Sequence, residues 1–188
     1  MQSENELPST DDRDLATVVC RPIRPDDALR LVRMFPRLSA ETLYRRFFSP
    51  VVKPDLERIR YLCEVDHDRR EALVALVGDD VIGVARYDRD PQDPRQAEVA
   101  VLVEDAWQGR GVGRFLMRRL GEVAHRNGVR RFRADVLASN DAPVKLARAV
   151  APMVEVSFAD GETHLLIPLD QTRERPSPPR GQARPVAS

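Results

Sequence analysis

The sequence predicts one α/β domain with a mixed order of helices and strands, and three observations lead to this fold class. The 188 residues suit a single ordinary domain better than two independent cores. Apolar residues follow helical spacing in the first third of the folded part, and β-rich runs then alternate with helical patterns. One β-rich run, residues 97–103, leads through a glycine-rich turn directly into an amphipathic helix.

The first third of the chain is predicted to be helical after one short strand at residues 17–21. A first helix begins at Asp26 and carries apolar residues as far as Phe35. The second covers residues 39–48, where the Ser39-Ala-Glu-Thr sequence resembles a capping box. The third begins after Pro54 and carries apolar residues up to Cys63.

The remainder is predicted to alternate between strands and helices. The expected strands share β-branched and apolar composition and cover residues 72–77, 81–87, 97–103, 131–138, 153–158 and 163–169. The first two of them are joined by Gly78-Asp-Asp, which predicts an antiparallel hairpin. An amphipathic helix runs from Val112 to a stop at Asn127-Gly128, and a shorter helix covers residues 141–150.

Composition limits both the domain boundaries and the classes of function. We expect the folded unit to span residues 16–170, flanked by a disordered polar segment at 1–15 and a disordered proline- and arginine-rich tail at 171–188. No segment resembles a secretory signal or a membrane span, which favours a cytoplasmic protein without a membrane partner. Cys20 and Cys63 stand far apart without companion histidines, so we expect no metal.

The charge balance argues against nucleic acid as a partner, although one local excess keeps that hypothesis open. The chain has 30 basic and 30 acidic side chains, so no global positive charge is available for a phosphate backbone. Eight arginines are nevertheless crowded between Arg110 and Arg133. Such a stretch suits a polyanionic ligand, and it is also typical of a solvated helix face.

The turn between residues 103 and 113 is the segment that indicates chemistry. Gly109, Gly111 and Gly113 stand between an apolar strand and the start of a helix. Main-chain N–H groups at a helix N-terminus are unpaired and lie at the positive end of the helix dipole, so they bind phosphate well. A P-loop is excluded because Arg114-Phe follows Gly113, and a G-x-G-x-x-G fingerprint fails in both possible registers.

The pattern that does fit is Q/R-x-x-G-x-G/A, here Gln108-Gly-Arg-Gly-Val-Gly113. On this motif the chain resembles the GCN5-related N-acetyltransferase (GNAT) superfamily. The runs Arg21-Pro-Ile-Arg-Pro25, Ser39 to Phe48 and Val65-Asp-His-Asp-Arg69 are more narrowly similar to the acetyltransferase domain of bacterial Pat-type protein lysine acetyltransferases. The resemblance covers about residues 18–150 and implies a mixed central sheet with helices on both faces and a splayed acyl-CoA cleft.

The resemblance also implies a set of residues that bind acetyl-CoA. The coenzyme A pyrophosphate is expected on the turn, and the pantetheine arm is expected beside the preceding strand, with a further contact after residue 138. The residues concerned are Val101, Leu102, Val103, Gln108, Gly109, Arg110, Gly111, Val112, Gly113, Arg114 and Asn140.

Acetyl transfer to an amine needs a base, because a lysine with a pKa of about 10.4 is almost entirely charged at neutral pH. Glu98 stands early in the strand that feeds the turn, where the superfamily commonly has its catalytic glutamate. We expect Glu98 to be the general base, with Glu104 and Asp105 as alternatives. The tyrosine that often protonates the departing thiolate has no counterpart in residues 141–152, so the general acid is unassigned.

The function that these residues imply is an N-acetyltransferase acting on a primary amine, most readily a protein lysine. A small-molecule amine or an N-terminal amine is the alternative acceptor. A module that binds acyl-CoA without turnover is the alternative class. The chain is expected to be a monomer or a homodimer.

Overall fold

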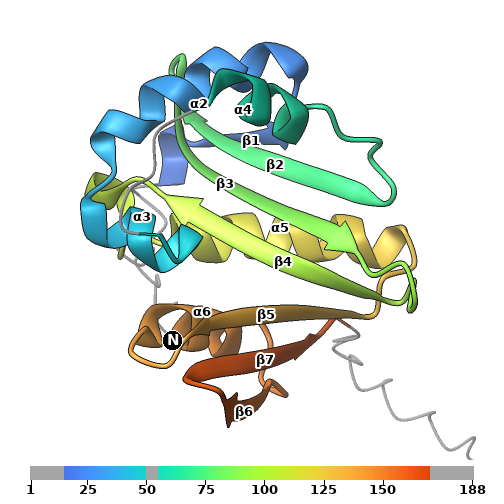
Figure 1. Ribbon diagram of the computed structural model, residues 1–188. Helices are drawn as coiled ribbons and strands as arrows, with labels where there is room; N and C mark the ends of the chain where they lie inside the picture. Colours follow the sequence, from blue (N-terminus) through green and yellow to red (C-terminus); the bar gives the residue numbers. More distant parts are fainter. Residues whose placement is uncertain (1–14, 50–54, 170–188) are drawn as a thin grey trace, which may run out of the picture.

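The computed structural model describes residues 15–49 and 55–169, and within them it contains one seven-stranded mixed sheet. The strand order is β1-β2-β3-β4-β5-β7-β6 (Figure 1). Only β4 and β5 pair in parallel, while every other neighbouring pair is antiparallel. The bounds are β1 Val19–Pro22, β2 Arg70–Val77, β3 Asp80–Arg89, β4 Gln96–Val103, β5 Arg131–Leu137, β6 Glu155–Ala159 and β7 Glu162–Pro168.

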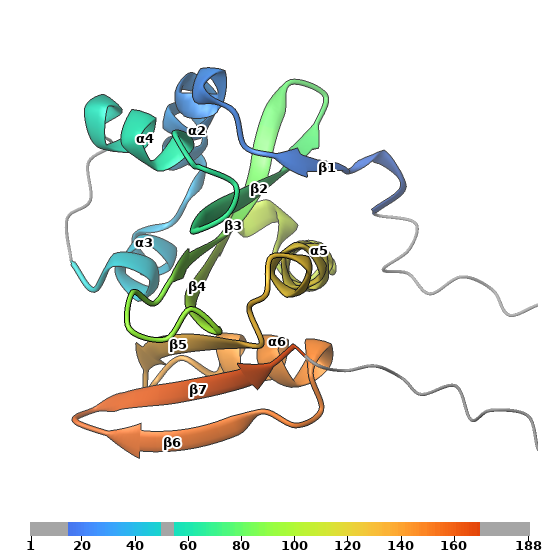
Figure 2. The same cartoon turned by 90° about the vertical axis from the view of Figure 1, so that its right-hand side faces the viewer.

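Helices cover both faces of the sheet, as Figure 2 shows along its edge. One face carries α2 (Ala28–Met34), α3 (Ala40–Phe47) and α4 (Leu56–Cys63), and the other carries α5 (Val112–Arg126) and α6 (Asp141–Val150). Short 3-10 helices are η1 (Leu15–Thr17), η2 (Pro25–Asp27), η3 (Phe35–Arg37) and η4 (Asp105–Trp107). The predicted fold class, a mixed α/β sheet between two helical layers, is confirmed.

Each helical layer closes its own hydrophobic core against the sheet. Leu116 and Leu120 of α5 pack with Tyr87 of β3 in one core, and Met34 and Ile59 of the opposite layer pack in the other. The middle residues of β2 are buried along the whole strand, because both faces of this strand are covered. Burial on both sides explains why β2 reads as a continuous apolar run.

Two predicted elements differ from those observed. The helix expected from Asp26 to Phe35 is divided into η2, α2 and η3. Pro36 lacks the N–H that a continuing α-helix would use, and α2 ends before it at Met34. The strand expected from residue 153 begins at Glu155. The disorder predicted for 1–15 and 171–188 lies outside the described residues, except that Leu15 opens η1. No helix within the described ranges is long and apolar enough to cross a membrane.

A buried ion pair anchors the first helical segment to β1. Asp27 is fully buried, and the guanidinium of Arg21 donates to its two carboxylate oxygens at 2.6 and 2.7 Å. The backbone N–H of Arg24 adds a third hydrogen bond at 2.9 Å. Burial by itself would raise the pKa of Asp27, but the hydrogen bonds from Arg21 and Arg24 outweigh it and lower that pKa. The carboxylate is therefore charged in the folded protein.

Candidate active site

The central feature of the sheet is the separation of β4 from β5. The two strands pair only from Gln96↔Arg131 to Glu98↔Arg133, while β4 continues to pair with β3 as far as Val103↔Gly83. One edge of β4 from residue 99 onward therefore has no neighbouring strand. Figure 1 shows the two strands diverging toward α3 and α6. An extended ligand can hydrogen-bond to such a free strand edge as an added strand would.

A cavity of about 480 Å³ fills the space between the diverging strands, and we call it the β4/β5 cleft. Its walls include residues 99–103 of β4, 134–136 of β5 and Leu146 of α6. Ten residues predicted from the sequence line it: Glu98, Val101, Leu102, Val103, Gln108, Gly109, Gly111, Gly113, Arg114 and Asn140. The cleft has a volume and a length of strand edge that suit a small extended ligand.

Two glycines shape the turn at the cleft's end. Gly109 and Gly111 have φ angles of 73° and 82°, a region that only glycine adopts without strain. Gly111 is the N-cap of α5 and offers no side chain, so the first N–H groups of the helix have no cap from it. Gly113 is different, because it is helical and a Cβ there would meet Leu146 and Val103 at ordinary distances of 3.6 and 3.7 Å.

The side chains of the turn have separate roles. Gln108 donates through Nε2 to the carbonyl of Val103 at 3.0 Å and to the hydroxyl of Thr42 at 3.2 Å, so it ties the turn to β4 and α3. Two predicted residues do not line the cleft. The guanidinium of Arg110 lies 5.4 Å from the centre of the Trp107 ring, and Val112 is buried in the core beneath the helix. Their predicted part in binding is therefore limited to the main chain.

Glu98 lies at the point where the two strands part. Its side chain is exposed, it lines the cleft, and it has no hydrogen-bond or ion-pair partner in the part of the chain that the structure describes. The alternative carboxylates are engaged elsewhere: Glu104 is buried and accepts from Arg37 at 2.8 Å. Asp105 accepts from the backbone of Ser39 at 2.9 Å. A carboxylate without a close partner can accept a proton from a ligand. A carboxylate that already accepts hydrogen bonds from the protein is a weaker base.

Asn140 supplies a second sign of a ligand. Its side chain is buried, it lines the cleft, and its Oδ1 atom has no hydrogen-bond partner. An unsatisfied buried acceptor is costly, so such atoms need an explanation. A ligand with an amide N–H would satisfy it. The orphaned oxygen, the free strand edge and the glycine turn all fit acetyl-CoA, which combines a diphosphate with an amide-bearing arm.

Sequence reasoning missed the contribution of α3 and β5 to the cleft. Arg46 and Phe48 line it from the helical side, and Asp135 lines it from β5. Asp135 is paired with Nδ1 of His164 at 2.7 Å. The only signal in the sequence was the adjacent pair Arg45-Arg46 on a predicted helix, which by itself is typical of a solvated face.

No cluster of potential metal ligands occurs among the residues that the structure describes. Both cysteines are free, and Cys63 is buried. Burial raises the pKa of the Cys63 thiol to about 11, so this thiol is protonated at neutral pH and is a poor nucleophile.

Comparison with known proteins agrees with this geometry. The family model for the acetyltransferase (GNAT) family matches residues 38–150. Acetyltransferase Pat of Mycolicibacterium smegmatis is 43% identical over 128 residues, which cover 67% of this chain and 38% of that protein. Acetyltransferase PA5475 of Pseudomonas aeruginosa is 34% identical over 129 residues, covering 66% of this chain and 69% of that one.

Among solved structures, the GNAT domain of S. lividans PAT has a TM-score of 0.75 and 36% identity, covering 83% of this chain and 93% of that domain. The chain belongs to the acetyltransferase (GNAT) family. Its nearer likeness is to proteins of the Pat type, of which the mycobacterial member is much longer than the segment it shares with this chain.

Proposed function

We propose that this protein transfers an acetyl group from acetyl-CoA to a primary amine, with a protein lysine as the acceptor. The observation that carries the proposal is the parting of β4 from β5 at Glu98, beside a glycine turn at the start of α5. Family membership supports acetyl-CoA as the donor. The likeness to Pat-type proteins supports the lysine acceptor.

Binding of acetyl-CoA uses main-chain groups in this proposal. The N–H groups at the start of α5 receive the diphosphate, and each partly buried contact of this kind contributes roughly 0.3 to 2 kcal/mol. Arg114, which lines the cleft, adds a charged donor. The free edge of β4 holds the pantetheine arm, and Asn140 accepts a hydrogen bond through Oδ1. The thioester then lies toward Glu98.

The transfer itself needs a neutral amine. Deprotonating a lysine at neutral pH costs about 4 to 5 kcal/mol, and Glu98 accepts that proton directly or through a water molecule. The amine nitrogen then attacks the thioester carbonyl carbon, so that a C–N bond forms and the C–S bond breaks. The coenzyme leaves as a thiolate, and the nitrogen loses its second proton as the amide forms. That proton passes to the thiolate through solvent, because a thiol with a pKa of about 8.5 is a tolerable leaving group.

The test is release of coenzyme A thiol from acetyl-CoA in the presence of lysine peptides and small amines, comparing wild type with Glu98→Gln. The substitution keeps the shape of the side chain and removes the base. We expect turnover to fall by about a hundredfold or more while acetyl-CoA affinity changes little. Glu122→Gln is the matched control, because Glu122 is an exposed glutamate of α5 that does not line the cleft and accepts from Arg119 at 3.4 Å.

Each part of the proposal, namely the base, the acceptor and the turnover, has its own contradicting result in this test. Undiminished turnover in Glu98→Gln would remove Glu98 from the role of base. Acetylation of small amines in preference to lysine peptides would change the acceptor. Coenzyme binding without thiol release for any acceptor would indicate a module that binds acyl-CoA without turnover.

A further inference from the structure

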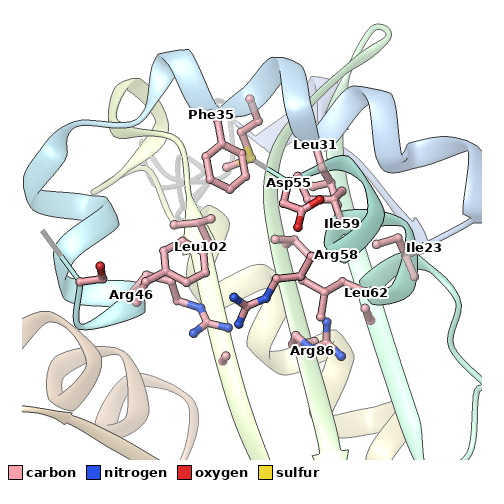
Figure 3. Close-up of a pocket in the computed structure, with 16 residues that line it drawn as sticks. Ile23, Leu31, Phe35, Arg46, Asp55, Arg58, Ile59, Leu62, Arg86 and Leu102 are labelled. Carbon is pink, nitrogen blue, oxygen red and sulfur yellow. The ribbon is translucent and has the colours of Figure 1, made fainter. Parts of the chain in front are cut away.

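A second cavity lies on the other side of β4 from the parting of the strands, beneath α2 and α4, with α3 at one end (Figure 3). Its volume is about 280 Å³. The upper walls are apolar and include Leu31 of α2 and Ile59 and Leu62 of α4. Val84 and Ala100 form part of the floor, on β3 and β4. Most of the residues that line this cavity do not line the β4/β5 cleft.

The two cavities adjoin each other along β4. Arg46, Ala100 and Leu102 line both of them. Glu98 stands two residues before Ala100, so the two side chains lie on the same face of the strand, about 7 Å apart along it. An acceptor whose amine reaches Glu98 can therefore extend a neighbouring group into the second cavity.

Three guanidinium groups converge in this cavity, which we call the arginine pocket. Figure 3 shows Arg46 of α3 and Arg58 of α4 directed toward each other, with Arg86 of β3 beneath them. Arg86 is paired with Asp88 at 3.1 Å, but Asp88 is shared with Arg70 at 3.2 Å. Within residues 15–49 and 55–169, neither Arg46 nor Arg58 forms a close ion pair with a carboxylate, although Glu98 and Asp88 attract Arg46 over a longer distance.

The nearby carboxylates offset only part of the positive charge of the arginine pocket. Asp55 lines it but acts as the N-cap of α4, accepting from the backbone N–H of Glu57 at 3.0 Å. Burial lowers the pKa of Arg46 and repulsion from Arg86 and Arg58 lowers it further, while attraction to Glu98 and Asp88 offsets only part of this lowering. Excess positive charge in a partly buried place is unfavourable, and an anion that enters relieves it. An arginine guanidinium suits a carboxylate, because two N–H groups can bond to its two oxygens.

We infer that the arginine pocket receives the acidic side chain of an Asp or Glu next to the acceptor lysine, and so selects lysines with an acidic neighbour. This inference rests on the proposed acetylation of protein lysines. The spacing of about 7 Å along β4 between Glu98 and Ala100, which lines the arginine pocket, corresponds to about two residues of extended peptide, whereas the carboxylate of an α-amino acid lies too close to its own α-amine. The apolar walls accommodate the methylene groups of the entering side chain.

The experiment compares paired peptides that contain one lysine and differ only in a neighbouring Glu or its uncharged counterpart Gln, at positions one and two residues to either side. Acetylation is measured at saturating acetyl-CoA. For the best position we expect the Glu peptide to have a KM about tenfold lower than the Gln peptide, the size of one hydrogen bond to a charged group, with a similar kcat.

The variant Arg58→Gln should raise the KM of the Glu peptide to that of the Gln peptide and leave the Gln peptide unchanged. Arg60→Gln is the matched control, because Arg60 is on the same helix and exposed as Arg58 is, but it does not line the pocket. The control should retain the tenfold preference. Equal KM values for the two peptides in wild type, or an Arg60→Gln variant that loses the preference as Arg58→Gln does, would overturn the inference.

A binding arm separates this inference from the proposed function. Peptides with norleucine in place of lysine cannot react, and calorimetry in the presence of coenzyme A measures their affinity. Tighter binding of the Glu than of the Gln norleucine peptide supports the arginine pocket even if no lysine peptide is acetylated, a result that would defeat only the proposed function. Equal binding of the two norleucine peptides overturns the pocket's role, whether or not lysine peptides are acetylated.

Discussion

The β4/β5 cleft and the arginine pocket adjoin each other along β4, yet they are built from different parts of the chain. The cleft uses a free strand edge and a turn that are contiguous in sequence, from residue 98 to residue 114, with main-chain groups as its chief donors. The arginine pocket uses side chains from α3, α4 and β3, which are separated by up to 40 positions. A site built from main-chain groups can therefore be recognised from a local sequence motif, whereas a site built from distant side chains forms only through tertiary packing.

The two regions are expected to fail in different ways. The largest effect is expected at Asp27, which lines neither cavity but anchors the helical layer above the arginine pocket through Arg21. Asp27→Asn keeps the shape of the side chain but removes its charge, so the guanidinium of Arg21 loses its carboxylate partner. We expect the free energy of unfolding in urea to fall by about 3 kcal/mol, with coenzyme A affinity of the folded protein little changed. Asp26→Asn is the control, because Asp26 is exposed and its ion pair with Arg30 is long, at 3.6 Å.

The pH dependence of this effect has a definite sign. The pKa of Asp27 is lowered in the folded protein, so the ion pair stabilises above the unfolded value of about 3.9 and that stabilisation is lost as pH falls through the folded pKa. The difference between wild type and Asp27→Asn should therefore shrink as the pH is lowered below about 4. A difference that stays constant across this range would contradict the charged state assigned to Asp27.

The second prediction concerns the β4/β5 cleft, where a substitution should weaken coenzyme A binding more than it lowers the free energy of unfolding. Gly111→Val forces a β-branched residue to a φ of 82° and displaces the N–H groups at the start of α5. Losing one or two such contacts should weaken coenzyme A binding by about tenfold to a hundredfold in calorimetry. Gly161→Val, at a φ of 81° in the β6–β7 hairpin, carries the same strain and should bind coenzyme A normally.

Equal losses of affinity in the two glycine variants would mean that strain, and not the position of the turn amides, controls binding. The β4/β5 cleft would then not behave as a main-chain site, and its contrast with the arginine pocket would not hold. Normal affinity in Gly111→Val, in a correctly folded protein, would remove the turn from the acetyl-CoA site altogether.

The smallest effect is expected at the far wall of the cleft. The hydrogen bond from His164 to Asp135 raises the pKa of the histidine above its ordinary value. The pair therefore stabilises fully below a pH of about 6.5, and this contribution is lost as pH rises through the folded pKa. In His164→Gln the loss of stability should be slight and confined to the acidic side. NMR titration of His164 in wild type and in Asp135→Asn tests the assignment, since the pKa should fall in the variant.

The elements of the fold were largely predictable because their signals are local. Helical spacing located α5, and the hairpin of β2 and β3 followed from two apolar runs around Gly78. The division of the first helix was missed, although Pro36 carried the signal for its end. For the site, the turn glycines and Glu98 were named from sequence and line the cleft, while their functional roles stay predictions.

The residues that sequence reasoning missed share one property: their environment is made by segments distant in the chain. Arg46 reads as one of two adjacent arginines on a helix, and nothing local distinguishes it from Arg45. Only packing of α3 beside β4 brings it to the meeting point of two cavities. Likewise, Glu104 and Glu98 are both plausible bases in sequence, and only Arg37, 67 positions away, removes Glu104 from consideration.

The sequence by itself determined the class of fold, the glycine turn and the family, because periodicity, backbone freedom and short motifs are properties of neighbouring residues. Tertiary structure alone decided where β4 leaves β5, which carboxylate stays free, and how three arginines come together beneath the helices. These features depend on contacts between side chains that are distant in the sequence, and burial and charge pairing decide which contacts form.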